Sequence, residues 1–323
     1  ERQSAFCAGC LFDFIRRTGM EKKETIGKAE ILLATIIWGF AFVVIRDALT
    51  VVPFHMLMVW RYTIAVAMMV LLFRKQIRKV DRELLFEGAV LGLLLYISQC
   101  FQTGALGFAD TTAGKVGFIT SLYVVQVPLF NWIYSRGKRK IRILPVLLAV
   151  VGLLLLTLNG TFGMGIGDVV ALIGSLGFTF HILAIDVFGK RHSAIELMTF
   201  QVMFAAVFAW IGCWVVGSPV PETVWNMQML FPILYLGIFS TTFGFLLQFL
   251  GQQHLKPEHS SILLSMESVF AMVCSVLFQG EQLNLQELAG CILMFAALIL
   301  AGKNNNDKIG NLQDKHMNGE IDN

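Results

Sequence analysis

Polar and aromatic side chains at helical spacing interrupt several long apolar stretches of this sequence. Residues three or four apart share one face of a helix, so these side chains can gather around a common space. Such groups suit non-covalent binding of a small polar molecule. The candidate binding residues are Trp38, Tyr96, Gln99, Tyr123, Gln126, His181, Ser265 and Glu267, with Phe42, Gln102 and Gln248 beside them.

Two of these residues can also exchange protons. A carboxyl group within an apolar stretch is costly when charged, so such a residue commonly serves a function. Glu267 is the stronger candidate for proton coupling because it lies near the middle of its stretch, and His181 is the second. The alternatives are that Glu267 binds a substrate ammonium group directly, and that the other polar residues only join helices by hydrogen bonds.

Arg61 also lies within an apolar stretch. It could bind an anionic substrate, because a guanidinium group matches a carboxylate well. It could instead have a structural role and pair with backbone carbonyls near the outer interface or with a carboxylate, for which Asp47 and Asp110 are candidates. The second half of the chain carries the neutral Gln201 at the equivalent position, which favours the structural role.

Motifs of covalent and cofactor chemistry are missing from the sequence. It contains no Gly-rich phosphate loop with Gly-Lys-Ser/Thr, no Gly-x-Ser-x-Gly nucleophile elbow and no convincing metal-ligand spacing. The sequence therefore predicts no catalytic residue, no cofactor and no metal site, and it favours a protein that is not an enzyme.

The elements that position the polar residues are predicted to be membrane-spanning helices. The chain has 323 residues, of which 56% are hydrophobic and 15% charged, and its mean hydropathy is +0.70. Apolar runs of about 20 residues are long enough to cross a bilayer. They lack the two-residue alternation of a membrane barrel, which leaves helices. The predicted spans are 29–45, 53–73, 85–105, 111–134, 143–158, 168–188, 194–216, 230–252, 257–279 and 283–302.

The sequence contains an internal repeat. Gly39-Phe40-Ala41-Phe42 recurs as Gly177-Phe178-Thr179-Phe180, and residues 121–137 align with 265–281. Because each half holds five spans, the second half must enter the membrane from the opposite side, which is typical of secondary transporters. The predicted all-α fold therefore has two inverted five-helix repeats, at 29–159 and 168–302, joined by a turn at 160–167. A cytoplasmic tail at 1–28, with a natural start at Met20, and a disordered cytoplasmic tail at 303–323 flank them.

The basic residues predict the orientation in the membrane. All 25 Lys and Arg residues except Arg46, Arg61 and Lys115 fall on one side of the ten-span arrangement. Positively charged loops stay in the cytoplasm, so both termini are expected there, in a multi-pass protein of the plasma membrane. Because topology explains the basic loops, no nucleic-acid partner is expected.

Several of these stretches resemble the EamA family of the drug/metabolite transporter superfamily. Residues 37–42 are similar to the family's Trp-Gly-x-x-Phe pattern, and Trp60-Arg61-Tyr62 followed by Ala65 is similar to its second-span pattern. Residues 251–290 resemble its last two spans, although Ser268 stands where the family usually has Pro. The resemblance implies a ten-span permease for small metabolites, often amino acids or related compounds.

The sequence is therefore interpreted as a secondary transporter that works by alternating access around a cavity at the bilayer midplane. Its expected partners are a small-molecule substrate and the lipid bilayer, with proton coupling as an option. The alternative is a membrane sensor without transport activity or a lipid-modifying membrane enzyme. Substrate identity, direction of transport and oligomeric state are not predicted.

The charge distribution generates a testable topology. Single cysteines introduced at Gly163 and Ser218 are expected to react with a membrane-impermeant thiol reagent from outside intact cells, since both lie on the sparsely charged side. Labelling of the Gly163 position only after lysis would contradict the inverted repeat.

Overall fold

The structure is a computed structural model that describes residues 2–76, 80–108, 113–137, 141–157, 165–217, 227–279 and 284–300. These residues form helices joined by short turns, as predicted. The positions Gly163 and Ser218, most of the inter-repeat turn and the tail at 303–323 lie outside the described residues. The helices are α1 (Arg2–Leu49), α2 (Phe54–Phe73), α3 (Arg82–Ala105), α4 (Ala113–Ser121), α5 (Tyr123–Tyr134), α6 (Ile143–Thr157), α7 (Ile166–Phe188), α8 (Ala194–Val216), α9 (Met227–Leu234), η2 (Tyr235–Gly244), α10 (Phe245–Gln252), α11 (Pro257–Leu264), α12 (Glu267–Gln279) and a last helix at Leu285–Leu300.

All ten predicted spans are helical within the described residues. Eight apolar segments are long enough to cross a membrane, and Ile143–Leu155 and Leu285–Leu300 are shorter apolar helices. The eight segments are Glu21–Leu49, Phe54–Phe73, Arg82–Ala105, Val116–Tyr134, Ile166–Phe188, Ala194–Val216, Met229–Gln252 and Pro257–Phe278. Most ends lie close to the predicted ones because polar or Gly-containing loops bound each apolar run.

The first helix begins earlier than predicted. The sequence suggested a tail over 1–28 that ends before the first span, whereas α1 is continuous through this boundary. The segment before residue 29 is rich in Glu and Lys, which are good helix formers. Lys28 Nζ also pairs with Glu24 Oε1, four residues earlier, at 2.8 Å. Pairs at this spacing stabilise a helix.

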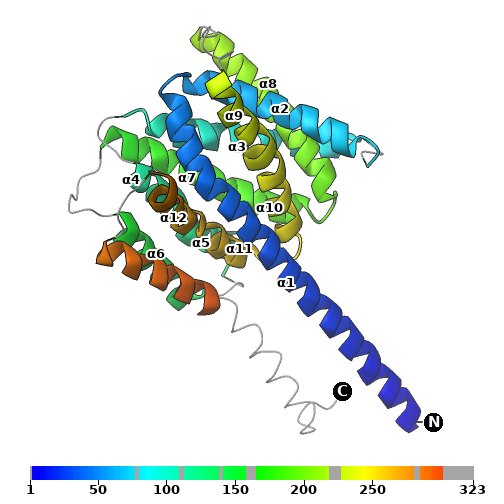
Figure 1. The fold of residues 1–323 in the computed structure, drawn as a ribbon. Coiled ribbons are helices and arrows are strands. Elements are labelled where there is room, and N and C mark those ends of the chain that lie inside the picture. Colours follow the sequence, from blue (N-terminus) through cyan, green and yellow to red (C-terminus); the bar gives the residue numbers. More distant parts are fainter. Residues whose placement is uncertain are drawn as a thin grey trace.

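The two halves of the chain interlock in one bundle (Figure 1). Helix α3 packs against α7 and α8, and α1 packs against α10 and α12. Helix α2 lies against α8 and η2. Each of these contacts joins a helix of the first half to a helix of the second, so the main hydrophobic core lies between the halves.

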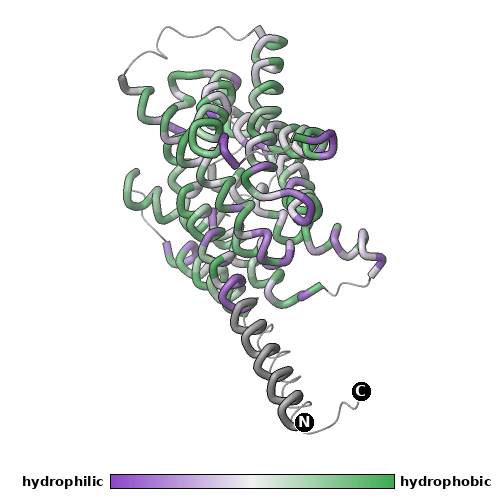
Figure 2. Tube along the Cα trace, turned by 90° about the vertical axis from the view of Figure 1, so that its right-hand side faces the viewer, coloured by the Kyte–Doolittle hydropathy of each residue, from purple (hydrophilic) through white to green (hydrophobic). Residues whose placement is uncertain are grey.

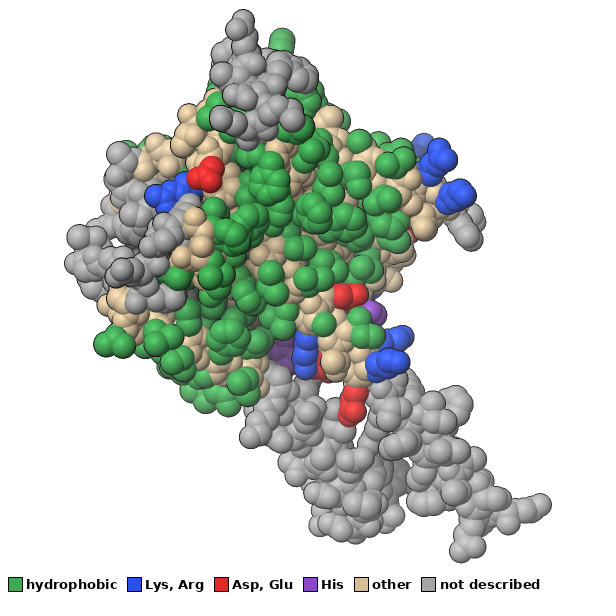
Figure 3. Space-filling model, in the orientation of Figure 1, with side chains coloured by type: hydrophobic (Ala, Val, Ile, Leu, Met, Phe, Trp, Pro, Cys, Tyr) green, Lys and Arg blue, Asp and Glu red, His purple; other side chains and the backbone are tan. Residues whose placement is uncertain are grey.

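Apolar side chains cover the outside of the bundle. Figure 2 shows hydrophobic residues along the helices and hydrophilic ones mainly at bends and ends. Figure 3 shows one face dominated by hydrophobic side chains, with charged groups near its edges. Large residues such as Leu71, Phe86 and Trp214 are 71%, 67% and 83% exposed. A surface of this kind suits contact with lipid and not with water.

Three of the described spans are interrupted near their middle. Helices α4 and α5 meet at Leu122, α11 and α12 meet at Ser265 and Met266, and the π-helix η2 joins α9 to α10. Non-helical or irregular backbone at membrane depth is tolerated where it is buried in protein or lines a cavity. These interruptions therefore point to the part of the bundle where a site can form.

The breaks at Leu122 and at Ser265 and Met266 do not lie at a proline, whereas Pro232 lies three residues before the start of η2. Helix α5 runs through Pro128, and the break lies at Leu122. The break between α11 and α12 forms although Ser268 replaces the Pro of the resembled family. There the Ser265 hydroxyl donates a hydrogen bond to the Ile262 carbonyl at 2.8 Å. Such a bond competes with the regular helix ladder.

Two glycines on α3 allow the halves to approach closely, as the small-residue spacing of Gly88 and Gly92 suggests. A Cβ atom at Gly88 would lie 2.4 Å from Phe200 Cβ, and one at Gly92 would lie 2.7 Å from the Gln201 carbonyl oxygen. Both contacts are shorter than real Cβ contacts, so α3 and α8 would have to separate.

We expect Gly92→Ala to lower the free energy of unfolding by about 1–3 kcal/mol, the usual cost of overpacking a tight core. The measurement is thermal unfolding in detergent. Gly117→Ala is the matched control, because a Cβ at Gly117 meets nothing within 4 Å. Equal melting temperatures for the two variants would contradict the tight α3–α8 contact.

Candidate functional site

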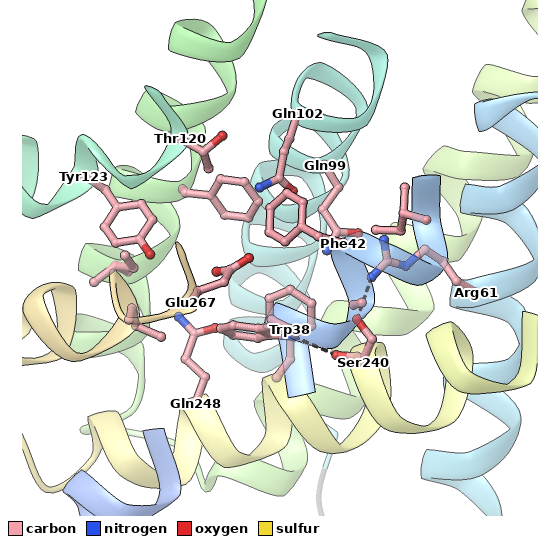
Figure 4. A pocket seen from close by; sticks show the side chains of 16 residues that line it. Trp38, Phe42, Arg61, Gln99, Gln102, Thr120, Tyr123, Ser240, Gln248 and Glu267 are labelled. Carbon is pink, nitrogen blue, oxygen red and sulfur yellow. Dashed lines mark hydrogen bonds between the residues drawn. The ribbon is translucent and has the colours of Figure 1, made fainter. Parts of the chain in front are cut away.

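A cavity lies inside the bundle, between the two halves (Figure 4). Both halves supply its walls, and polar groups alternate with aromatic rings around it. The lining residues are Trp38, Ala41, Phe42, Ile45, Arg61, Gln99, Gln102, Thr120, Tyr123, Phe178, Ile182, Ser240, Phe245, Gln248, Leu264 and Glu267. A lining that mixes aromatic and polar side chains suits a small molecule that carries polar groups.

Glu267 and Tyr123 lie at the interruptions of two equivalent spans. Glu267 is the first residue of α12, and Tyr123 is the first residue of α5. Figure 4 shows the Tyr123 hydroxyl and the Glu267 carboxylate directed into the same space. The two junctions also touch, because Ser121 Oγ and Ser268 Oγ lie 2.8 Å apart. The breaks therefore bring a carboxylate and a phenol to one cavity.

Some buried oxygens of the lining have no hydrogen-bond partner within the described part of the chain. They are the hydroxyls of Tyr123 and Thr120 and the Gln248 side-chain carbonyl. A buried polar atom without a partner costs free energy, and a bound molecule or water can remove that cost. These groups are therefore available to contact a substrate.

Arg61 faces the cavity from α2 and is only 3% exposed. Its Nε donates to Thr241 Oγ1 at 2.9 Å, and its Nη2 donates to Ser240 Oγ at 3.2 Å. The sequence offered Asp47 as a partner, but the structure gives Arg61 these two hydroxyls of η2 instead. Asp110, the other candidate, lies outside the described residues.

Trp38 is held by the same turn of η2. Its indole Nε1 donates to the Ser240 carbonyl oxygen at 2.9 Å. The Trp38 ring packs against Phe245, with 4.8 Å between the ring centroids. Ser240 thus fixes Trp38 through its backbone and Arg61 through its side chain. The π-helix therefore positions the side chains of both Trp38 and Arg61 in the cavity lining.

Four of the eight predicted site residues line this cavity, namely Trp38, Gln99, Tyr123 and Glu267. The Gln99 side-chain carbonyl also accepts a hydrogen bond from the Tyr62 hydroxyl at 2.7 Å, which orients the amide. Arg61 and the neighbouring residues Phe42, Gln102 and Gln248 line the cavity too.

Tyr96 and Ser265 lie outside the lining. Tyr96 packs toward α8, where its hydroxyl would meet any Cβ added at Gly212, and its ring lies 6.4 Å from that of Phe208. Ser265 forms the break between α11 and α12 and uses its hydroxyl for the backbone. Tyr96 lies near Gln99 in the sequence, and Ser265 lies between Leu264 and Glu267, but neither side chain lines the cavity.

Gln126 and His181 form hydrogen bonds between helices. Gln126 Oε1 accepts from Thr179 Oγ1 at 2.6 Å and from Ser175 Oγ at 3.2 Å. His181 Nε2 lies 2.6 Å from Gln201 Oε1, with the rings of Phe245 and Phe249 about 6 Å away. In this conformation neither side chain belongs to the cavity lining.

The sequence reasoning missed Thr120, Phe178, Ser240 and Phe245, which also line the cavity. Phe178 carried a signal, because it belongs to the repeated Gly-Phe-x-Phe element and matches Phe40. Threonine and serine are common in membrane helices, and nothing in the spacing of Thr120 and Ser240 distinguishes them from packing residues. Within the described residues, no group of three or more His, Cys, Asp or Glu could hold a metal ion.

Known proteins are similar to this chain in sequence and in fold. The sequence profile of the EamA-like transporter family matches twice, over residues 25–158 and 165–302. An uncharacterized transporter of Archaeoglobus fulgidus is 30% identical over 291 residues, which cover 89% of this chain and 90% of that one. The uncharacterized transporter YoaV of Bacillus subtilis is 23% identical over 283 residues, which cover 84% and 94%. One crystal structure superposes with a TM-score of 0.71 at 17% identity, over 87% of this chain and 96% of the other, and shows the fold alone.

The position of Gln126 predicts a purely structural effect. Gln126→Leu removes the acceptor shared by Ser175 and Thr179, and we expect it to lower stability by about 0.6 to 1.7 kcal/mol, the measured range for hydrogen bonds between membrane helices. Thermal unfolding measures the effect. Gln102→Leu is the matched control, because Gln102 faces the cavity. A larger loss of stability in the Gln102 variant would contradict these assignments.

Proposed function

This chain belongs to the EamA-like transporter family and is a multi-pass membrane transporter, and on that premise we propose that it moves small metabolites by alternating access around the central cavity. Members of the family are transporters and not enzymes. The proposed substrates are amino acids or related compounds. We further propose that both termini face the cytoplasm, which agrees with the distribution of Lys and Arg.

The observation that carries the proposal is a carboxylate in the cavity wall at a helix break. Glu267 lines the cavity between the two halves, at the start of α12. Charged groups inside a membrane bundle commonly mark the route of a substrate or a proton. Transporters built from inverted repeats bind their substrate at this place, beside interrupted helices.

The interruptions also support a change of conformation. Helices α11 and α12 are separated by only two residues, and α4 and α5 by one. Short breaks of this kind let two rigid halves of a span change their relative angle. Because one break lies in each half of the chain, the cavity can open toward either side by related movements. This is the requirement of alternating access.

Glu267 is the proposed proton-coupling residue. His181, the other candidate, is hydrogen-bonded to Gln201 and lies outside the cavity lining. Glu267 faces the cavity, where a change in its protonation can be coupled to substrate occupancy. The second possibility is that the Glu267 carboxylate binds a substrate ammonium group directly.

Glu267→Gln keeps the shape of the side chain and removes its titration. If Glu267 couples transport to protons, proteoliposomes with the variant should lose accumulation driven by a pH gradient and retain exchange of substrate. If Glu267 pairs with a substrate ammonium, exchange itself should fall roughly tenfold or more, since charge-assisted hydrogen bonds are worth more than neutral ones. The substrate for this assay comes from metabolite profiling of cells with and without the protein.

Glu21→Gln is the matched control, because Glu21 is exposed at the start of the first span and far along α1 from the cavity. Unchanged accumulation and unchanged pH dependence in Glu267→Gln would rule out both roles. A wild-type protein that binds a metabolite and never moves it across the bilayer would favour the sensor alternative.

A further inference from the structure

Arg61 is a buried charge whose hydrogen bonds, within the described part of the chain, go to neutral groups. It is 3% exposed, and no Asp or Glu of the described residues forms an ion pair with it. Its hydrogen bonds go to the neutral hydroxyls of Ser240 and Thr241. A charged side chain in a membrane bundle normally pairs or faces an aqueous cavity. Arg61 faces a cavity, because it belongs to the cavity lining.

The guanidinium group keeps donors available for a ligand. It has five N–H donors in a rigid planar fork, and no acceptor. The two hydrogen bonds to η2 use one donor on Nε and one on Nη2. The remaining donors suit two parallel hydrogen bonds to a carboxylate.

The π-helix places this group with little freedom. Ser240 and Thr241 are consecutive residues of η2, and both hydroxyls accept from Arg61. The same element is anchored elsewhere, because Trp38 donates to the Ser240 carbonyl and Thr242 Oγ1 donates to the Gly237 carbonyl at 2.8 Å. A donor held in place before binding loses less entropy when a ligand arrives.

We infer that Arg61 is the anion-binding residue of the cavity, that Ser240 and Thr241 position it, and that the transported molecule carries a carboxylate. Glu267 faces the same cavity from α12. Arg61 and Glu267 attract each other electrostatically but form no direct ion pair, so the donors of one and the acceptors of the other can contact oppositely charged groups of one ligand. The inference rests on the proposed function in one respect, namely that the cavity is where the substrate binds.

The first experiment measures the charge requirement of transport. Proteoliposomes are loaded with three pools: the common amino acids, their carboxamides, which lack the anionic group, and their deaminated acids, which lack the ammonium group. Mass spectrometry follows the loss of each compound, with protein-free liposomes to subtract leakage. We expect the wild type to release at least one amino acid and to release its carboxamide at least roughly tenfold more slowly, because a charged hydrogen-bonded contact is lost.

The variants separate binding from support of the fold. Arg61→Gln should reduce amino-acid flux by about tenfold or more, since hydrogen bonds to charged groups are the strong ones. It should also reduce the preference for amino acids over carboxamides. Arg61→Lys keeps the charge but not the fork, and should retain part of that preference. Ser240→Ala should raise KM more than it lowers kcat, as expected for a positioning residue. Arg74→Gln is the matched control, because Arg74 is exposed at the end of α2.

A second experiment needs no transport. Phenylglyoxal modifies accessible arginines, and peptide mass spectrometry reads the modification at Arg61 and Arg74 separately. We expect the amino-acid pool to protect Arg61 and the carboxamide pool not to, with Arg74 labelled equally in both. Equal labelling of Arg61 with both pools, or no labelling at all, would overturn the inference.

The outcomes distinguish the two proposals. If the wild type moves carboxamides as fast as amino acids, or if Arg61→Gln keeps the wild-type flux and preference, the inference is wrong and the transport function stands. If no pool moves through the wild type while the amino-acid pool still protects Arg61, the inference stands and the proposed transport of amino acids fails.

Discussion

The free-energy cost of placing a charged side chain within the membrane constrains the fold of this protein. A charged side chain at the centre of a bilayer costs about 2.5–3.5 kcal/mol on insertion scales, and more by simulation, unless it faces a cavity or a partner. Arg61 and Glu267 both lie within spans, on different helices, and both face one interior space. The bundle must therefore enclose that space and exclude lipid from it. The packing of α1, α2, α3, α7 and α12 around the cavity satisfies this requirement.

Close helix contacts and polar bridges keep the enclosure intact. Gly88 and Gly92 let α3 approach α8, and the pair formed by Tyr62 and Gln99 joins α2 to α3. Gln126 bridges α5 to α7 through hydroxyl groups. Van der Waals packing and such bridges replace the hydrophobic effect, which does not favour contact between helices in lipid. The polar residues outside the cavity thus have a role of their own, which is to hold its walls together.

Sequence reasoning reached the spans and the repeat but only part of the site. Each span was predictable because a long apolar run is bounded by polar loops, and hydrocarbon thickness fixes its length. Glu267 and Tyr123 were predictable because the repeat alignment makes them equivalent. The rotation of each helix about its axis was not predictable. Gln126 and Gln99 therefore looked alike, although both bridge helices and only Gln99 also lines the cavity.

The hydrogen-bond partners of Arg61 could not be predicted from the sequence, for a different reason. Its partners Ser240 and Thr241 belong to a π-helix, in which the register of side chains differs from that of an α-helix. No sequence pattern in residues 235–244 predicts that register. The break at Ser265 likewise forms without proline, through a single hydroxyl that competes for a backbone carbonyl. Local hydrogen bonds of this kind are decided by the folded surroundings.

The hydrogen bond between Ser121 and Ser268 has a mechanical consequence. It ties the end of α4 to the first turn of α12, so the two interruptions are linked across the bundle at 2.8 Å. A tilt of α12 about its break stretches this bond unless α4 follows. Movement of one break without the other would break this hydrogen bond, at a cost of about 0.6 to 1.7 kcal/mol, so joint movement of the two halves of the chain is favoured.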